Sequence, residues 1–180
     1  MSFLDNTAVT RFDEAVDAAF EPLRQNPITD RAMYALTELG DFSLIWHTIS
    51  VGRAAFGSRR QEREMYRLSA ALAIEAAIVN GPLKLAFRRQ RPVVAEERTH
   101  TLRQPKTSSF PSGHASAAAC AVTVLIDGAG PAATAGWITL GALVAGSRVH
   151  VRIHHASDIV GGALVGIAAG SVMRRFWPLT

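Results

Sequence analysis

The chain has 180 residues, enough for one domain, and 48% of them are hydrophobic while only 19% are charged. Soluble domains carry about 25% charged residues, so this composition excludes a disordered or fibrous chain and argues against an ordinary soluble domain. The single cysteine, Cys120, excludes a disulfide framework and a cysteine-based zinc site. The net charge of +4 comes almost entirely from arginine, which binds phosphate through paired N–H donors. Composition therefore indicates a small membrane protein with an anionic partner.

Residues 1–28 predict an amphipathic N-terminal helix. The charged side chains lie on one face, and the apolar side chains recur at helical spacing on the other. The apolar residues are Val9, Phe12, Val16, Phe20 and Leu23. Either Pro22 or the pair Asn26-Pro27 is expected to end the helix. The stretch has five acidic residues and no continuous apolar run, which argues against a secretory signal. The helix could pack on a soluble core, but we favour a position on a membrane surface.

Five apolar segments follow, and they predict a bundle of helices in a membrane. The segments are residues 32–56, 68–85, 115–126, 128–147 and 159–173. Segment 128–147 has 20 uncharged residues, enough to cross a hydrocarbon core of about 30 Å, whereas charged side chains interrupt segment 32–56. Glycine and alanine dominate the last three segments, which favours close helix packing in lipid. A compact, soluble, all-helical enzyme is the alternative.

The first cluster of chemistry-bearing residues runs from Lys84 to Pro92. Lys84, Arg88 and Arg91 are spaced to lie on one face of a helix that Pro92 ends. Three cations on one face repel one another unless an anion offsets their charge. The cluster could bind a phosphate, or it could be a basic cap against lipid headgroups.

The second cluster, residues 108–114, leads directly into the apolar segment 115–126. Ser112 is a good N-cap, so the backbone N–H groups of Gly113 and His114 are expected to point out of the helix start. Such a helix start binds anions readily. The alternative is an ordinary capped helix with a histidine at its rim.

The third cluster lies between the two most hydrophobic segments, in residues 147–158. His154 and Asp158 are four residues apart, so the carboxylate could hold one ring nitrogen and leave the other free, as in nucleophilic catalysis. On a continuous helix, His150 would share that face, which suggests a metal site as an alternative. The neighbouring cations Arg148 and Arg152 argue against a bound metal.

Together the clusters resemble the signature of the type 2 phosphatidic acid phosphatase (PAP2) superfamily, which is K-x6-RP, PSGH and SR-x5-H-x3-D. Its three parts occur here in order and with the family's spacings, as Lys84…Arg91-Pro92, Pro111–His114 and Ser147-Arg148…His154…Asp158. The resemblance covers a core of residues 84–158 in a single domain, residues 1–180. It implies an all-α integral membrane bundle of about five to six helices, with a PAP2/haloperoxidase-like core and the amphipathic N-terminal helix.

The resemblance also implies roles for individual residues. His154 would be the nucleophile, Asp158 would orient and stabilise its ring, and His114 would be the general acid and then the general base. The phosphoryl oxygens would be held by Lys84, Arg91, Ser112, Gly113 and Arg148. No metal and no other cofactor is expected, because fixed cations can neutralise the charge of the transferred phosphoryl group.

The family includes membrane lipid phosphatases, soluble secreted acid phosphatases and vanadium haloperoxidases, and the uncharged segments favour the membrane branch. We therefore expect a lipid-phosphate phosphatase whose partners are the membrane and a lipid phosphate, not nucleic acid. Candidate substrates are polyprenyl phosphates or diphosphates, phosphatidic acid and phosphatidylglycerol phosphate. The alternative is a non-catalytic protein that binds or carries anionic lipid. Its motivation is the set of basic residues outside the signature: Arg88, Arg89, Arg98, Arg103, Lys106 and Arg152.

Two arguments about membrane orientation disagree. If five segments span, nine cations lie on the active-site side and six on the other, so the positive-inside rule places the site in the cytoplasm. Phosphate chemistry requires several of those nine cations, however, and membrane members of the family generally face outward. We therefore expect a multi-pass cell-membrane protein with its active site on the extracytoplasmic face. The sequence leaves the oligomeric state open.

Overall fold

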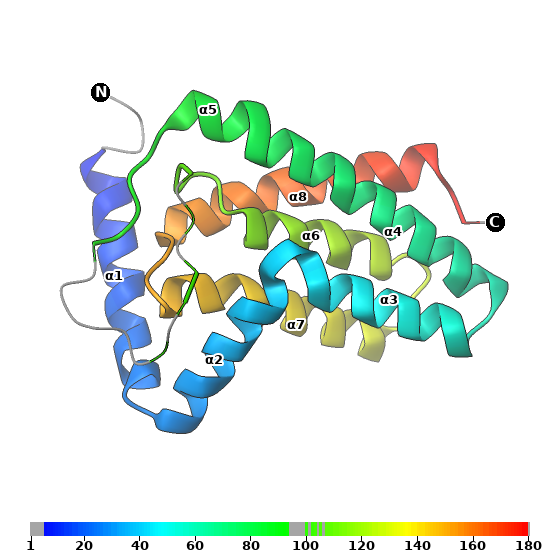
Figure 1. Cartoon of the computed structure of the whole chain (residues 1–180), viewed down its shortest axis with the longest axis horizontal. Helices are drawn as coiled ribbons and strands as arrows, with labels where there is room; N and C mark the ends of the chain where they lie inside the picture. The colour runs from blue at the N-terminus through cyan, green and yellow to red at the C-terminus, as the bar shows by residue number, and fades with distance from the viewer. Residues whose placement is uncertain (1–5, 94–99, 101, 104, 106, 180) are drawn as a thin grey trace.

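The computed structural model describes residues 6–93, 100, 102–103, 105 and 107–179, and every regular element within them is a helix (Figure 1). The helices are α1 (Thr7–Arg24), α2 (Pro27–Gly40), α3 (Leu44–Phe56), α4 (Arg59–Ile78), α5 (Lys84–Phe87), α6 (Gly113–Leu125), α7 (Pro131–His150) and α8 (Ala156–Phe176). A 3-10 turn (Asp41–Ser43) joins α2 to α3, and a π-helical turn (Val79–Leu83) joins α4 to α5. The predicted all-α fold is confirmed.

The predicted N-terminal helix corresponds to α1, and its residues 1–5 lie outside the described part of the chain. The helix continues through Pro22, so the Asn26-Pro27 pair ends it. Asn26 then starts α2, because its side-chain oxygen accepts hydrogen bonds from the backbone N–H groups of Ile28 and Thr29. Helix α1 contacts α7 and α8 and lies across one end of the bundle (Figure 1).

The apolar segment 32–56 is not a single helix. Phe42 and Ser43 adopt left-handed backbone conformations, with φ of 52° and 59°, and break the segment into α2 and α3. These helices have 14 and 13 residues, fewer than the roughly 20 that a membrane span requires. The bend between them projects Asp41 toward the start of α6.

Within the described part of the chain, two stretches are long and apolar enough to cross a membrane. They are Arg59–Phe87, which contains α4 and α5, and Ala156–Phe176, which is α8. Helix α6 is apolar but has only 13 residues. The uncharged segment 128–147 forms most of α7, whose 20 residues are long enough to span but have a lower mean hydropathy than the two stretches.

Helix α6 is the central helix and contacts α4, α7 and α8 (Figure 1). Its small residues let the neighbouring backbones approach closely. On α8, glycines 162, 166 and 170 recur every fourth residue and face α6, so they lie along one stripe. A Cβ at Gly166 would meet the backbone carbonyl of Ser116 on α6 at 2.0 Å, and a Cβ at Gly162 would meet that of Ser112 at 2.4 Å. Side chains at these positions would therefore force the two helices apart.

Gly166→Ala should lower the stability of the fold by about 1–3 kcal/mol, the usual cost of overpacking a core. Gly136→Ala on α7 is the matched control, because no atom lies within 4 Å of the added Cβ. The control should melt at or slightly above the wild-type temperature, since alanine favours a helix over glycine. Thermal unfolding in detergent tests both variants, and a Gly166→Ala protein as stable as the control would contradict the proposed packing.

Candidate active site

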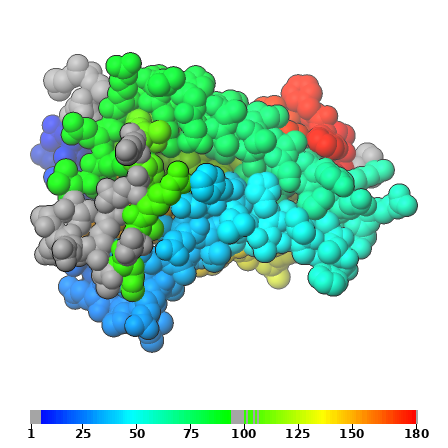
Figure 2. Space-filling model, viewed as in Figure 1, coloured from blue at the N-terminus to red at the C-terminus, as the bar shows by residue number. Residues whose placement is uncertain are grey.

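The signature residues gather at one end of the bundle, where α5 ends, α6 begins and α7 leads into α8 (Figure 1). A cavity of about 590 Å³ lies between this end and the α2–α3 bend. Figure 2 shows the face of the molecule on which α3 lies beside α4. Six of the eight predicted site residues line the cavity: Lys84, Arg91, Gly113, His114, Arg148 and His154. The other two, Ser112 and Asp158, are completely buried.

His154 lies in the short connection between α7 and α8, and its side chain is almost completely buried. Its Nδ1 is 3.5 Å from Oδ2 of Asp158, in the first turn of α8. The Ser109 hydroxyl donates to the same carboxylate oxygen at 2.5 Å and lies 3.4 Å from Nδ1 of His154. The backbone N–H of His155 also donates to Asp158 Oδ2, at 2.8 Å. These donors fix the carboxylate beside the ring of His154.

The predicted helical face of His150, His154 and Asp158 does not form. Helix α7 ends at His150, and Arg152 in the following turn has a left-handed conformation with φ of 53°. His150 contacts Asp30 of α2 instead, with 2.9 Å between Nε2 and Oδ1. The three residues do not share one helix, so the prediction that they line one helical face, on which the alternative metal site depended, is wrong.

The other ring nitrogen of His154 faces Arg91. Arg91 Nη1 lies 3.1 Å from His154 Nε2 and also donates to the carbonyl of Ile153. Because a guanidinium can only donate, Nε2 is the acceptor and carries a lone pair. Burial lowers the pKa of His154 to about 3; Asp158 opposes this shift, and Arg91 and Arg148 add to it. The ring is therefore neutral at neutral pH, with Nε2 available for reaction.

His114 begins α6 and lines the same cavity. Its Nε2 is 3.0 Å from the carbonyl oxygen of Thr37 and 3.3 Å from Oδ1 of Asp41, so this nitrogen is the donor. The hydrogen bond from His114 lowers the pKa of Asp41, which is therefore ionised beside the ring. Burial lowers the pKa of His114, and the hydrogen bonds with Asp41 and Thr37 oppose this shift. The carboxylate therefore favours the protonated imidazole that a general acid requires, but it does not outweigh burial in the free protein. Gly40 provides room for this ring, because a Cβ there would lie 2.5 Å from Cδ2 of His114.

Two further cations of the signature, Lys84 and Arg148, also line the cavity. Lys84 Nζ donates to the side-chain oxygen of Asn80 at 3.0 Å and lies close to Gly113. Arg148, in the last turn of α7, is 1% exposed and lines the cavity. Ser112 lies behind the lining, where its hydroxyl caps α6 and its backbone N–H donates to the carbonyl of Asp158 at 3.0 Å. Ser112 therefore joins the starts of α6 and α8.

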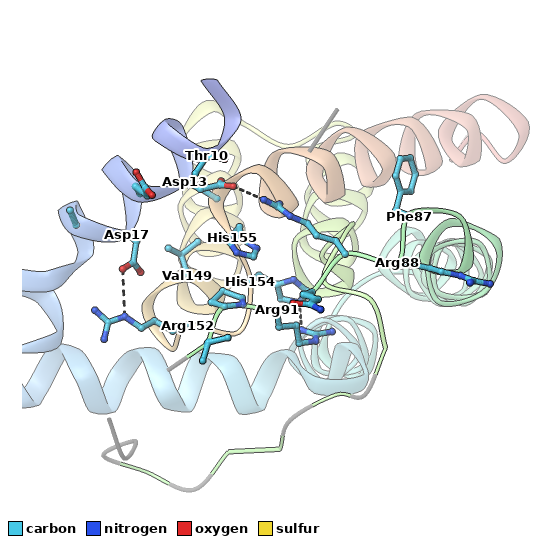
Figure 3. A pocket seen from close by; sticks show the side chains of 17 residues that line it. Thr10, Asp13, Asp17, Phe87, Arg88, Arg91, Val149, Arg152, His154 and His155 are labelled. Carbon is cyan, nitrogen blue, oxygen red and sulfur yellow. Dashed lines mark hydrogen bonds and ion pairs between the residues drawn. The ribbon is translucent and has the colours of Figure 1, made fainter. Parts of the chain in front are cut away.

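Arg88 does not share a face with Lys84 and Arg91. Helix α5 ends at Phe87, and Arg88 adopts a left-handed conformation with φ of 45°. Figure 3 shows the Arg88 side chain pointing away from Arg91 and His154. The predicted helical row of three cations is wrong, because the chain turns before Pro92 and only Lys84 and Arg91 reach the cavity.

Three residues that contact the catalytic groups were missed by the sequence analysis. Ser109 and Arg89 both bind the Asp158 carboxylate, and Asp41 binds His114. Ser109 and Arg89 lie inside the quoted clusters, but neither occupies a signature position. Asp41 carried a usable signal, because an acidic residue within an apolar segment often has a functional role.

The site therefore combines a neutral, oriented histidine with several fixed cations and a second histidine paired with a carboxylate. Cations that are buried together require an anion near them. A phosphoryl group fits this requirement, because its equatorial oxygens carry the charge that such cations neutralise.

Comparisons with known proteins agree with this geometry. Among solved structures, LpxE of Aquifex aeolicus matches with a TM-score of 0.78 and 23% identity, over 97% of this chain and 99% of that chain. The transmembrane PAP2-type phosphatidylglycerolphosphate phosphatase of Bacillus subtilis matches with a TM-score of 0.74 and 23% identity, over 96% of this chain and 88% of that chain. At this level of identity, the two matches show a shared fold.

Sequence comparisons add the family. A search of curated proteins found no match. The sequence model of the PAP2 superfamily matches residues 65–179, which is more than half of the chain and includes all three parts of the signature. The chain therefore belongs to the PAP2 superfamily.

Proposed function

We propose that this phosphatase hydrolyses the phosphate ester or diphosphate of a membrane lipid, without a metal ion, through a phosphohistidine intermediate. The observation that carries the proposal is the arrangement of His154, whose Nδ1 lies 3.5 Å from Asp158 and whose Nε2 lies 3.1 Å from Arg91. A neutral, oriented imidazole is a nucleophile once its lone pair is released, here from the hydrogen bond with Arg91. Binding a lipid phosphate without cleaving it would require only the cations.

In the first step, Nε2 of His154 attacks phosphorus and the bond from phosphorus to the lipid oxygen breaks. His114 gives its proton to that oxygen, so the lipid product leaves protonated. The attack places a positive charge on the ring of His154, which Asp158 stabilises from the Nδ1 side. Arg91, which donates to Nε2 in the free protein, transfers its hydrogen bond to a phosphoryl oxygen when substrate binds.

In the second step, water attacks phosphorus and the bond between Nε2 and phosphorus breaks. His114 is now neutral and takes a proton from the water, which restores both histidines and releases inorganic phosphate. Lys84, Arg91, Arg148 and the backbone N–H of Gly113 hold the equatorial oxygens throughout. These cations supply the charge neutralisation that Mg²⁺ provides in other phosphoryl-transfer enzymes.

A membrane lipid is the proposed substrate because two stretches can cross a membrane and the cavity lies at one end of the bundle. The lipid tail could then remain in the bilayer while its phosphate enters the site. Among polyprenyl phosphates or diphosphates, phosphatidic acid and phosphatidylglycerol phosphate, the small size of the bundle favours the polyprenyl class. We also propose a multi-pass protein of the cell membrane with an extracytoplasmic site, as is general for membrane members of the family.

The non-catalytic alternative receives less support from the structure than from the sequence. Arg89, one of the basic residues that motivated it, forms ion pairs with Asp13 and Asp158. Arg152 is paired with Glu21, at 2.9 Å. Arg98 and Lys106 lie outside the described residues. Part of the basic surplus is therefore neutralised within the protein.

The purified protein should release inorganic phosphate from at least one of these lipid classes in detergent that contains EDTA. His154→Ala should remove essentially all turnover without changing thermal unfolding, because no neighbouring group can attack phosphorus. Rapid-quench labelling with a radioactive phosphate ester should trap an acid-labile, base-stable adduct on His154. Loss of activity in EDTA would disprove the metal-free mechanism, and binding without phosphate release would support the lipid-carrying alternative.

Arg91→Ala and Arg148→Ala should each lower kcat/KM by about 10²–10³-fold, comparable with the loss of one oxyanion-hole donor. Arg88→Ala is the matched control, because Arg88 is exposed and points away from the cavity (Figure 3). The control should lose far less activity. Equal losses in all three variants would show that the basic cluster acts through its overall charge, not through contacts with the phosphoryl oxygens.

His114→Ala should lower activity on a lipid phosphate by about 10²–10⁴-fold, the usual range for a general acid or base. A nitrophenyl phosphate should show a smaller loss, because its leaving group needs little protonation. Comparing the two substrates in wild type and variant measures this difference. An equal loss on both substrates would argue against proton transfer from His114 to the leaving oxygen.

A further inference from the structure

Helix α1 contributes a buried carboxylate to the catalytic end of the bundle. Asp13 is 7% exposed, although it lies on the charged face of a helix expected to rest on a membrane surface. Its carboxylate accepts hydrogen bonds from the backbone N–H and the hydroxyl of Ser157, at 2.7 and 2.8 Å. Figure 3 shows Asp13 on the same side of α1 as Asp17, facing the segment that carries His154 and His155. Asp13 is thus directed toward the start of α8.

The same carboxylate also binds Arg89, with Nη2 of Arg89 donating to Oδ2 of Asp13 at 2.7 Å. The other terminal nitrogen of Arg89, Nη1, donates to Asp158 Oδ1 at 2.6 Å and to the Ser157 hydroxyl at 2.7 Å. One guanidinium therefore bridges a carboxylate of α1 and the catalytic carboxylate of α8. Charge-assisted hydrogen bonds of this length are strong and directional.

The two oxygens of Asp158 have different partners as a result. Oδ1 accepts from Arg89, while Oδ2 accepts from Ser109 and from the backbone of His155 and lies next to Nδ1 of His154. Because Oδ1 is held by Arg89, the carboxylate cannot rotate without losing a buried charged contact. Its Oδ2 is thereby kept facing His154.

We infer that Asp13 and Arg89 are positioning residues for the phosphatase reaction, which hold Asp158 and, through it, the nucleophile His154. The inference rests on the proposed function. Asp13 lies outside the residues that match the family, 65–179, so the N-terminal helix completes an active site whose signature lies elsewhere in the chain. Arg89 lies within the first part of the signature but at one of its unspecified positions.

The charges support this assignment. Arg89 alone would neutralise Asp158 and weaken its stabilisation of the positive ring that forms on His154 during attack. With Asp13 on the other side of the guanidinium, two carboxylates share one cation, and a net negative charge remains to face His154. Since all three side chains are 12% exposed or less, solvent screens these interactions only weakly.

Asp13→Asn tests the inference, with Asp17→Asn as a matched control. Asp17 lies one helical turn further along α1 and also forms ion pairs, with Arg24 and Arg152, but it does not contact Asp158. Asp13→Asn should lower kcat by about 10- to 100-fold, as for residues that hydrogen-bond to metal ligands in metalloenzymes, while KM stays within about threefold. The control should keep kcat within about twofold. Rapid-quench experiments should show the Asp13→Asn loss in the rate of His154 phosphorylation.

A double-variant experiment distinguishes a positioning role for Asp13 from a merely structural one. If Asp13 acts through Arg89, Asp13→Asn should lower kcat less in an Arg89→Gln background than in the wild-type background. Equal losses in both backgrounds, or similar losses for Asp13→Asn and Asp17→Asn, would overturn the inference. Wild-type protein that releases phosphate from no lipid would instead count against the proposed function. An active wild type with a fully active Asp13→Asn variant would refute the positioning role alone.

Discussion

The close contact between α6 and α8 is the constraint on which the catalytic geometry depends. Gly162 and Gly166 allow the backbone of α8 to approach the carbonyls of Ser112 and Ser116 to within a distance that no side chain would permit. The backbone N–H of Ser112 then donates to the carbonyl of Asp158. The start of α6, with His114, is thus held against the start of α8, with Asp158. Helix packing therefore sets the relation between His114, the proposed general acid, and Asp158, the proposed partner of the nucleophile.

The second feature of the site is a balance of charge under burial. Lys84 and Arg148, which are buried, line one cavity together with the half-buried Arg91, an arrangement that an anionic substrate stabilises. Asp158 lies behind His154 and Asp41 beside His114, so each histidine has its own acidic partner. Asp41 and Glu75 line the cavity together with the cations.

Elements outside the family-matched residues complete the site. The bend between α2 and α3 supplies Asp41, and the polar face of α1 supplies Asp13, which reaches Asp158 through Arg89. An amphipathic helix at the end of the bundle is thus more than a surface element. Its apolar residue Phe20 packs edge-on against His150 of α7, while its acidic face contacts Ser157 in the first turn of α8 and Arg152 in the connection that carries His154.

The sequence by itself determined the fold class and the family, because the order and spacing of a signature can be recognised without knowing where helices end. It also predicted eight site residues, six of which line one cavity. It could not locate the helix ends correctly. The stop of α5 at Phe87 moved Arg88 away from the cavity, and the stop of α7 at His150 removed a predicted helical face. Only the tertiary structure brought Asp13, Asp41, Arg89 and Ser109 to the catalytic groups. Those contacts join residues 45 to 76 positions apart, and local periodicity carries no information about which distant residues meet once helices pack.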